Sequence, residues 1–461
     1  MNRVSSESAE MTGSSSHSRT PAANLAIISG EMSGDLVGGA LAREIAARRP
    51  DVKLWGIGSR HLKAAGVELL YDSAEWSGIG IVQSLKLYPR IRFTAYPRVL
   101  REIERRKPSA VVSIDFGAFN VKVARWCTAH NVPFMWYFPP GSWKRRGKLK
   151  DEIARITKRV VTPFPWSEER LKALGANAEY VGHPLLELVR PTLTKTQFAD
   201  RFGLEPGRPI VGLLPGSRGF EMDHNTPAML GAARKILSAM PDAQFVIGAV
   251  SAPARTRLEN LVREFAASEA ATRQASRNQP SSNNVERDAR LVTNEGFIVS
   301  GGAMKTDFKQ RLQQGAEPSS WLPLVIAENM TYDVMAHSDA LIICSGTATL
   351  EAALLNTPMV IIYRGSKMME MEAKVLRINP EHIGLPNIIA DKRIVPEFIQ
   401  DAANPDALSE AVLNVLTDPA ARAGARQALS GMRSILEPPA GSPGASARAA
   451  EIALELANIP I

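Results

Sequence analysis

The sequence predicts an α/β protein built from two Rossmann-like, doubly wound domains with a ligand cleft between them. Short apolar runs alternate with amphipathic helical stretches along most of the chain, which is typical of a parallel sheet covered by helices on both faces. A proline-rich polar stretch at Gly182–Pro209 interrupts this alternation, which then starts again. The length of 461 residues suffices for two or three domains with separate cores.

The first domain is expected at residues 23–205. It follows a serine-rich segment, residues 1–22, which lacks the apolar core of a signal peptide and is expected to be a disordered tail. Apolar runs predict its strands, and a helix is expected after each of the first two, at Leu41–Arg49 and Val121–His130. The strands are predicted at Leu25–Ser29, Ala110–Asp115, Val132–Phe138 and Arg159–Phe164.

The second domain is expected at residues 206–430, and C-terminal helices from about 430 to 461 are expected to pack back on the first domain. A polar, low-complexity segment predicts a flexible insertion at about 267–323, most simply a surface loop. The predicted strands are Ile210–Leu214, Ala243–Val250, Leu341–Cys344 and Met359–Arg364.

Composition limits the cellular setting. The two cysteines, Cys127 and Cys344, cannot form a disulfide framework, and their apolar neighbours predict burial in a reducing compartment. No apolar run approaches the ~20 residues of a membrane span. We therefore expect a cytoplasmic or peripheral protein. The formal net charge of +8 is concentrated partly in Tyr88–Pro108 and Trp143–Lys150.

The basic segment Tyr88–Pro108 interleaves arginines with apolar and aromatic residues. This pattern is typical of a segment that lies on an anionic membrane surface. Taken alone, it fits an ordinary surface helix with a solvated basic face better. Nucleic acid is the weakest interpretation, because no nucleic-acid-binding motif accompanies the segment.

One predicted turn has the composition of a diphosphate site. Ligands of open α/β sheets bind beyond the carboxyl ends of the strands, where helix N-termini attract phosphate. The turn after Leu341–Cys344 offers small and hydroxylated residues, and the following carboxylate can accept hydrogen bonds from a ribose. A simple helix cap is the alternative. The residues concerned are Ser345, Gly346, Thr347, Thr349 and Glu351.

A second turn follows the strand at Ile210–Leu214. Gly216 and Ser217 can present backbone N–H groups, and Arg218 can pair with phosphate through two hydrogen bonds. The alternative is a solvated turn arginine. We favour phosphate binding, because the turn ends a strand in the same half as the diphosphate site.

The first turn of the chain, "SGEMSGD", is acidic, which disfavours phosphate and suits sugar hydroxyls. Its two glycines permit a tight turn, and its aspartate can cap the helix that follows. The residues predicted to contact substrate here are Gly30, Glu31, Ser33, Gly34 and Asp35.

Several enzyme classes are disfavoured by the absence of their motifs. The sequence has no G-x-x-x-x-G-K-[ST], no G-x-G-x-x-G, no D-x-D, no H-E-x-x-H and no C-x-x-C. We therefore expect no metal and no cofactor.

Two α/β halves, a diphosphate-type turn and no metal pair resemble glycosyltransferases of the two-Rossmann-domain (GT-B) type. The motifs are similar, in order and spacing, to those of the lipid-A-disaccharide synthase family. They are GEMSGD (Gly30–Asp35), GIGIV (Gly78–Val82), IDFGAFN (Ile114–Asn120), VGHPLLE, LLPGSR, SGTATLE and GLPNIIA (Gly384–Ala390).

The resemblance implies an inverting transfer from UDP-2,3-diacylglucosamine to the 6-hydroxyl of 2,3-diacylglucosamine 1-phosphate (lipid X). It implies a UDP-sugar donor, an acylated acceptor, no nucleic acid, and a cytoplasmic enzyme peripheral to the inner membrane, which the segment Ile79–Leu100 would touch. Whether the enzyme forms a homodimer is left open by the sequence. By resemblance, the further substrate-binding residues are Asn120, Trp143, Arg146 and Asn387.

Two positions depart from the family pattern. The second aspartate of I-D-x-P-D-F-N, a candidate base in the family, is Ala118 here, and Arg145 replaces an aromatic residue. Because alanine cannot accept a proton, either another carboxylate serves as base, or the acceptor differs, or the chain is a divergent relative with altered chemistry. Asp115 is the leading candidate, with a structural cap as its alternative role, and Glu31 and His183 follow.

Three other functions stay open from the sequence. The chain is alternatively a divergent UDP-sugar transferase acting on another acceptor, a sugar-nucleotide epimerase of the same shape, or a sugar-nucleotide-binding protein without catalysis. The replacement at Ala118 is the reason to keep the last of these.

Overall fold

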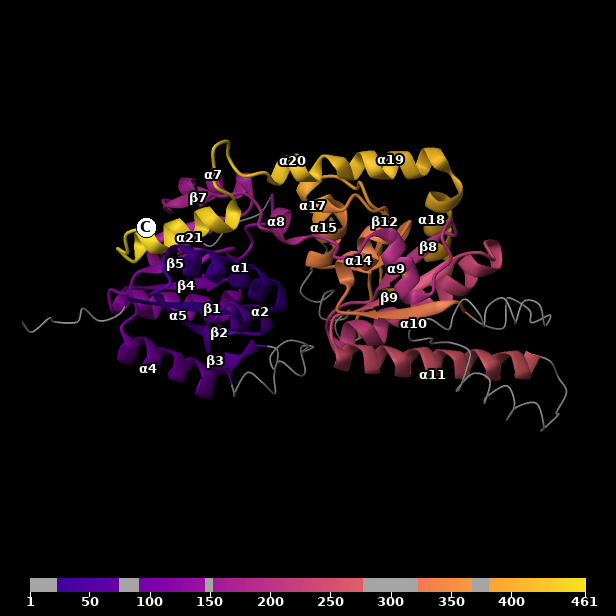
Figure 1. Ribbon diagram of the computed structural model, residues 1–461, viewed down its shortest axis with the longest axis horizontal. Coiled ribbons are helices and arrows are strands. Elements are labelled where there is room, and N and C mark those ends of the chain that lie inside the picture. Colours follow the sequence, from indigo (N-terminus) through magenta and orange to yellow (C-terminus); the bar gives the residue numbers. More distant parts are fainter. Residues whose placement is uncertain (1–22, 74–90, 146–151, 277–321, 367–380) are drawn as a thin grey trace, which may run out of the picture.

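The computed structural model describes residues 23–73, 91–145, 152–276, 322–366 and 381–461. These residues form two sheets whose strands are all parallel, ordered β3-β2-β1-β4-β5-β6-β7 and β10-β9-β8-β11-β12-β13. In both orders the first strand of the half lies inside the sheet, and the chain winds outward in both directions. The two halves lie side by side (Figure 1). The predicted fold class is confirmed.

The first half contains seven strands among the described residues. They are β1 (Asn24–Ser29), β2 (Lys53–Gly58), β3 (Glu68–Asp72), β4 (Ala110–Ile114), β5 (Phe134–Tyr137), β6 (Arg159–Thr162) and β7 (Ala178–Tyr180). Its helices are α1 (Met32–Arg48), α2 (Arg60–Ala64), α4 (Tyr96–Arg106, after a π-turn at Ile91–Ala95), α5 (Gly117–Ala129), α6 (Ile153–Ile156), α7 (Pro165–Ala173) and α8 (Leu185–Leu188).

Each sheet of this fold is buried on both faces, which is why the strands read as continuous apolar runs. In β1, Leu25 and Ile27 pack with α1 and the C-terminal helix α21 (Ala445–Leu456), whereas Ala26 and Ile28 pack with α4 and α5. Successive side chains therefore serve opposite helical layers, as the pleat requires.

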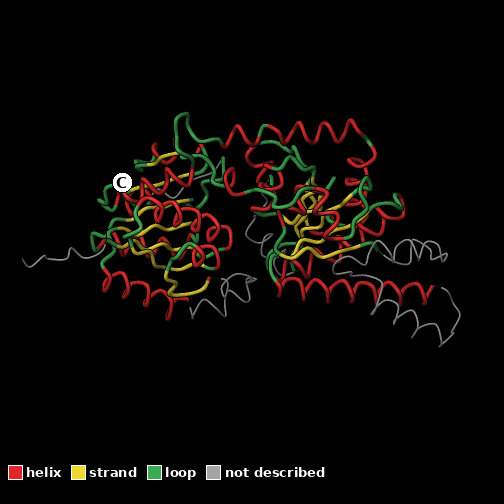
Figure 2. The backbone as a smooth tube through the Cα atoms, viewed as in Figure 1, coloured by secondary structure: helices red, strands yellow, loops and turns green. Residues whose placement is uncertain are grey.

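The second half is built in the same way. Its strands are β8 (Ile210–Leu214), β9 (Gln244–Ala249), β10 (Leu324–Glu328), β11 (Ala340–Cys344), β12 (Met359–Tyr363) and β13 (Glu397–Ile399). Its helices are α9 (Lys195–Phe202), α10 (Gly219–Ala239), α11 (Ala252–Ser276), α14 (Thr331–His337), α15 (Thr347–Leu354), α17 (Leu385–Ala390), α18 (Pro405–Thr417), α19 (Pro419–Ser430) and α20 (Met432–Leu436), with a 3-10 turn at Gln400–Ala402. Figure 2 shows the strands of both halves enclosed by helices.

The chain returns to the first half at its C-terminus. Helices α19 and α20 run along the second half toward the first, and α21 then lies over α1 (Figure 1). The Glu187 carboxylate accepts a hydrogen bond from the Ala445 amide (2.5 Å), and Arg448 pairs with Glu179 (2.7 Å). These contacts fasten α21 to the first half.

Two observed boundaries differ from the expected ones. The second half starts before residue 206, because Phe198 of α9 is buried in its core and the Asp333 carboxylate of α14 accepts hydrogen bonds from the amides of Thr192 and Leu193 (2.8 and 2.7 Å). The insertion expected from residue 267 begins within a helix, since α11 continues to Ser276. Residues 277–321 lie outside the described residues.

The described part of the basic segment is the turn at Ile91–Ala95 followed by α4. Several of its arginines are engaged within the molecule: Arg106 pairs with Glu68 (2.6 Å) and with Glu102 (2.7 Å), and its guanidinium stacks on the Trp55 ring. Phe93, by contrast, is 73% exposed. None of the helices that the structure describes is long and apolar enough to cross a bilayer.

Candidate functional site

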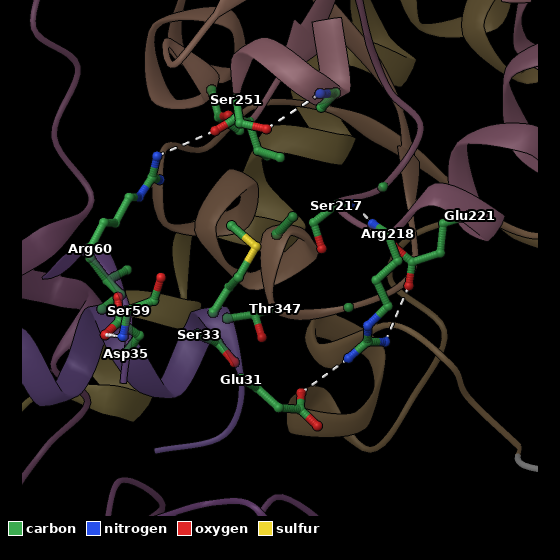
Figure 3. Close-up of a pocket in the computed structure, with 18 of the residues that line it drawn as sticks. Glu31, Ser33, Asp35, Ser59, Arg60, Ser217, Arg218, Glu221, Ser251 and Thr347 are labelled. Atoms are coloured by element: carbon green, nitrogen blue, oxygen red, sulfur yellow. Dashed lines mark hydrogen bonds and ion pairs between the residues drawn. The ribbon is translucent and has the colours of Figure 1, made fainter. Parts of the chain in front are cut away.

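A cavity of about 1700 Å³ lies between the two halves, at the carboxyl ends of the central strands of both sheets. The first half contributes residues from the turns after β1, β2 and β4, and the second half contributes those after β8, β9, β10 and β11. This is the position at which open α/β sheets bind ligands. Figure 3 shows the side chains of both halves that face this cavity.

One ion pair joins the two halves across the cavity. Glu31 immediately precedes α1, Arg218 immediately precedes α10, and Arg218 Nη2 lies 3.1 Å from Glu31 Oε2 (Figure 3). Both side chains are about two-fifths exposed, at 44% and 37%. The acidic turn of the first half therefore meets the P-G-S-R turn of the second half.

The Glu221 carboxylate accepts hydrogen bonds from backbone amides of the P-G-S-R turn. One carboxylate oxygen accepts hydrogen bonds from the backbone amides of Ser217 (3.0 Å) and Arg218 (3.1 Å), and the other lies 3.3 Å from Arg218 Nη1. Gly216, at φ 124°, permits this approach, because a Cβ there would lie 2.5 Å from Glu221. We predicted that Gly216 and Ser217 would offer these amides to phosphate, but here a buried carboxylate occupies those of Ser217 and Arg218.

The turn before α15 is open by comparison. Gly346 immediately precedes the helix at φ 155°, and no atom lies within 4 Å of the position that a Cβ would take. Ser345, Gly346 and Thr347 line the cavity. The hydroxyls of Ser345 and Thr349 are used within the protein, since they donate to the carbonyls of Ile383 (2.7 Å) and Gly346 (2.8 Å). This helix start can therefore bind an anion through its backbone N–H groups.

Glu351 lies one turn into α15 and also lines the cavity. Burial raises the pKa of its carboxyl to about 7, although the hydrogen bond from Tyr332 (3.2 Å) acts in the opposite direction. A carboxylate at this point can accept hydrogen bonds from a ribose next to an anion held by the helix start.

The turn after β4 adopts a left-handed conformation at two residues that are not glycine. Asp115 has φ 47° and Phe116 has φ 50°, a conformation that costs free energy and gathers at functional sites. Gly30 makes room for it, because a Cβ there would lie 2.3 Å from the Phe116 ring. The buried Asn120 side chain donates to the Asp115 carbonyl (2.9 Å) and holds the turn from α5.

The electrostatic setting of Asp115 differs from that of an ordinary surface carboxylate. Burial, and then the negative charge of Glu31, raise the pKa of Asp115 to about 6, against smaller opposing effects of the Phe116 amide and Arg218. Asp115 therefore lies within electrostatic reach of the ion pair that joins the halves. A carboxylate with a pKa near 6 can act as a general base close to neutral pH.

Asp35 has a role that we did not predict. Its side chain is 1% exposed, and its oxygens accept hydrogen bonds from the amides of Ser59 (2.6 Å), His61 (2.8 Å) and Leu62 (3.2 Å). It therefore caps α2 rather than the helix that follows it. Ser33 lines the cavity, and Gly34 packs against Ser29, where a Cβ would lie 2.6 Å from the hydroxyl.

His183 does not line the cavity, so the structure contradicts the prediction that it serves as a base. It is 3% exposed, between the rings of Phe138 and Phe164, and its Nδ1 accepts a hydrogen bond from the Leu185 amide (3.2 Å). Burial lowers the pKa of its imidazole to about 3. A histidine in this setting is neutral and caps α8.

Six further predicted residues are not among those that line the cavity: Gly34, Asp115, Asn120, Trp143, Thr349 and Asn387. Asn387 is fully buried, donates to the Val395 carbonyl (2.8 Å) and accepts from the Ile394 amide (2.7 Å), so it shapes the turn after α17. Trp143 is 38% exposed, with the Lys144 ammonium over its ring. Arg146 lies outside the described residues.

Sequence reasoning missed several charged residues of the site, among them Arg60 and Glu221. Arg60, the first residue of α2, lines the cavity and reaches the second half, and Glu221 holds Arg218. Glu221 stands three residues after Arg218, a spacing at which a carboxylate returns to the start of its helix, so this signal was present in the sequence. Arg60 had no such signal, because its proximity to the second half arises from tertiary structure.

Comparison with known proteins places the chain in a family. The model of the lipid-A-disaccharide synthetase family matches residues 25–280 and 297–435. The lipid-A-disaccharide synthase of Syntrophus aciditrophicus is 32% identical over 431 residues, which cover 93% of this chain and 97% of the relative. That of Geobacter sulfurreducens is 32% identical over 447 residues, covering 97% and 99%.

The chain belongs to the lipid-A-disaccharide synthase family. It is a glycosyltransferase, and the resemblance inferred from its motifs is confirmed. Among solved structures, the S. aureus MnaA–UDP co-structure aligns with a TM-score of 0.56 at 11% identity, covering 95% of this chain and 98% of that one. A kitacinnamycin glycotransferase aligns with a TM-score of 0.52 at 14% identity, covering 94% and 99%. At these identities the two structures support the fold alone.

Ala118 departs from the pattern of the family to which the chain belongs, which leaves open which residue accepts the proton. This residue lies in the first turn of α5 and lines the cavity, so its side chain is in the right region but cannot transfer a proton. Arg145, the other departure, donates to the Ile389 carbonyl (2.6 Å) and stacks on the Trp166 ring. The arginine therefore connects the two halves.

Proposed function

We propose that this glycosyltransferase joins UDP-2,3-diacylglucosamine to 2,3-diacylglucosamine 1-phosphate, giving the lipid A disaccharide and UDP. Family membership supplies the reaction class. The observation that carries the assignment of the site is the Glu31–Arg218 ion pair, which places the acidic turn of one half beside the phosphate-type turns of the other. A donor bound on one half and an acceptor bound on the other would meet there.

The donor is assigned to the second half. The amides at the start of α15 would bind the diphosphate, with Ser345, Gly346 and Thr347 around it, and Glu351 would accept hydrogen bonds from the ribose. Arg218 would stabilise the negative charge that develops on UDP as it departs. Glu221 positions Arg218 by holding both its amide and its guanidinium.

Asp115 is assigned as the general base. The acceptor 6-hydroxyl would attack C1 of the donor sugar, the bond from C1 to the UDP oxygen would break, and the proton would pass to the Asp115 carboxylate. The raised pKa of Asp115, about 6, suits this task, because the group is mostly ionised at neutral pH and still basic enough to accept a proton. Glu31 is a weaker candidate, since its carboxylate is paired with Arg218.

We also propose that the enzyme acts in the cytoplasm at the surface of the inner membrane. Both substrates carry acyl chains, and Phe93 is 73% exposed immediately before the arginine-rich helix α4. An aromatic anchor beside cations suits an anionic bilayer surface. Co-sedimentation with vesicles of phosphatidylglycerol and phosphatidylethanolamine should fall for Phe93→Asp while the affinity for UDP stays the same. Equal co-sedimentation of the variant would remove Phe93 from the contact.

The reaction is tested by incubating the purified chain with both substrates in detergent and separating the products. We expect stoichiometric disaccharide and UDP that appear only when both substrates are present. UDP release with a different acceptor, or interconversion of the donor sugar without an acceptor, would replace the proposal with a divergent transferase or an epimerase. UDP binding without turnover of any donor would indicate a binding protein.

A further inference from the structure

Arg60 reaches from the first half across the cavity to the second. Its guanidinium Nη1 lies 3.0 Å from Asn329 Oδ1 and 3.3 Å from the carbonyl oxygen of Val250, both in turns that follow strands of the second half. In Figure 3 the Arg60 side chain extends toward the segment that carries Ser251, away from the Glu31–Arg218 pair. The residue is exposed and lines the cavity.

The partners of Arg60 are all neutral among the residues that the structure describes. Besides Asn329 and Val250, the guanidinium Nε approaches His61 Nε2 at 3.1 Å. Its positive charge contributes, after burial, to the lowered pKa of His61. Two other arginines of the cavity have carboxylate partners: Arg218 pairs with Glu31 and Glu221, and Arg257 pairs with Asp223.

An arginine held only by neutral acceptors can exchange them for an anion. A phosphate accepts two charge-assisted hydrogen bonds from one guanidinium, and such bonds are roughly twice as strong as those to a carbonyl. The proposed reaction, on which this inference rests, brings two phosphate-bearing substrates into one cavity. The donor diphosphate is assigned to the α15 turn and Arg218 on the second half, which leaves the acceptor phosphate without a partner.

We propose that Arg60 binds the phosphomonoester of the acceptor sugar. Arg60 belongs to the half that also holds Asp115, so it would fix the acceptor by its phosphate while Asp115 faces the attacking hydroxyl. Lys122 of α5 and Arg190 also line the cavity. Arg190 follows α8 and donates to the Glu187 carbonyl of its own segment (3.1 Å). Both cations compete with Arg60 for the phosphate, so Lys122→Met and Arg190→Met are assayed beside Arg60→Met.

The test combines two proteins with two acceptors. Wild type and Arg60→Met are assayed with 2,3-diacylglucosamine 1-phosphate and with the methyl glycoside of the same sugar, which lacks the phosphate. We expect wild type to lose about 10- to 100-fold in kcat/KM when the phosphate is absent. With the phosphorylated acceptor, Arg60→Met should have a kcat/KM lower than that of wild type by a similar factor. With the glycoside, its kcat/KM should be close to that of wild type. The KM of the UDP donor should stay the same.

Matched variants separate a phosphate contact at Arg60 from a purely structural role of that residue. Arg257→Met, which removes a guanidinium paired with Asp223, should keep the preference for the phosphorylated acceptor. Arg60→Lys should restore part of that preference. The proposal is overturned if Arg60→Met lowers kcat/KM equally with both acceptors, which is the result expected if Arg60 only holds the two halves together. It is also overturned if the KM of the donor rises instead, or if Lys122→Met or Arg190→Met abolishes the preference for the phosphorylated acceptor.

Calorimetric binding of the two acceptors separates this inference from the reaction itself. Tighter binding of the phosphorylated acceptor that disappears in Arg60→Met supports the site even if no disaccharide forms. Equal binding of both acceptors by wild type contradicts the site even if the disaccharide does form.

Discussion

The two halves both use a carboxylate beside the cavity to satisfy backbone amides at the start of a helix, although not at equivalent turns. In the first half, Asp35 of α1 satisfies three backbone amides at the start of α2, in the turn after β2. After β8, Glu221 satisfies two backbone amides before α10. Each half therefore uses its own carboxylate to satisfy backbone amides that would otherwise attract a phosphate. The turn after β1 and the turn after β8 are joined by the Glu31–Arg218 pair.

The turn before α15 is different, since the space beside the Gly346 Cα is open. The comparison teaches that a glycine-containing turn at a helix start binds an anion only if the chain leaves its amides open. Asp35 and Glu221 both line the cavity, but their oxygens accept hydrogen bonds from backbone amides, so they differ from a carboxylate such as Glu31, which pairs with a side chain across the cavity.

Arg218→Ala should lower kcat by roughly 10²- to 10³-fold, because it removes the cation assigned to the departing UDP. Initial rates at saturating donor would measure the loss. Arg257→Ala is the matched control, since that arginine lines the cavity and is paired with Asp223. Equal losses in the two variants would indicate a general effect of positive charge in the cavity.

Glu221→Ala and Asp35→Ala should each lower the free energy of unfolding by about 1–3 kcal/mol, because each removes the buried carboxylate that accepts hydrogen bonds from backbone amides at the start of a helix. Only Glu221→Ala should also lower kcat, by roughly tenfold, since it releases one side of Arg218. Urea unfolding and initial rates would be measured on both proteins. A similar fall in kcat for folded Asp35→Ala would contradict its assignment to the fold.

The sequence predicted the central strands of the two sheets, because burial on both faces leaves a direct signal, but it did not predict β2, β3, β7, β10 and β13. The apolar runs at Ala110–Asp115 and Met359–Arg364 coincide with β4 and β12 to within one residue. The return of the chain to the first half was expected from about residue 430, and in the structure α21 contacts α1, Glu187 and Glu179.

Individual roles in the site were predicted less well than its location. The turns after β1, β8 and β11 do converge on one cavity, since the order of strands dictates it. Whether a polar side chain is available to a ligand depends on its partners in the folded chain, such as the Ser59 amide for Asp35 or the Val395 carbonyl for Asn387. Residue type and spacing do not contain this information.

The stability of Asp115→Asn provides an independent measure of the buried charge. The pKa of Asp115 is raised from 3.8 to about 6, so ionisation disfavours the folded state above pH 6, whereas both states are protonated below about pH 3. The variant should therefore unfold less readily than wild type at pH 7–8, by an amount on the order of 2 kcal/mol, and the difference should vanish toward pH 3. Asparagine tolerates the left-handed backbone at this position. A difference that does not depend on pH would contradict the shift.

Glu31→Gln and Arg218→Ala should move the acid limb of the pH profile of kcat/KM in opposite directions. Removing the negative charge of Glu31 lowers the pKa of Asp115, so the limb should shift to lower pH. Removing Arg218 raises that pKa, and the limb of the residual activity should shift to higher pH. Shifts of a few tenths of a pH unit would be enough to support this effect of charge on Asp115. If the acid limbs of both variants coincided with that of wild type, Asp115 would not control the profile.

The most direct test of the account is the rate of disaccharide formation by Asp115→Asn compared with wild type, both at saturating donor and acceptor. Because Ala118 cannot accept a proton, Asp115 is assigned that task. We expect a fall in kcat of about 10²- to 10⁴-fold, with UDP affinity unchanged and the acid limb near pH 6 abolished. A variant that works at the wild-type rate, with the same pH profile, would contradict this assignment.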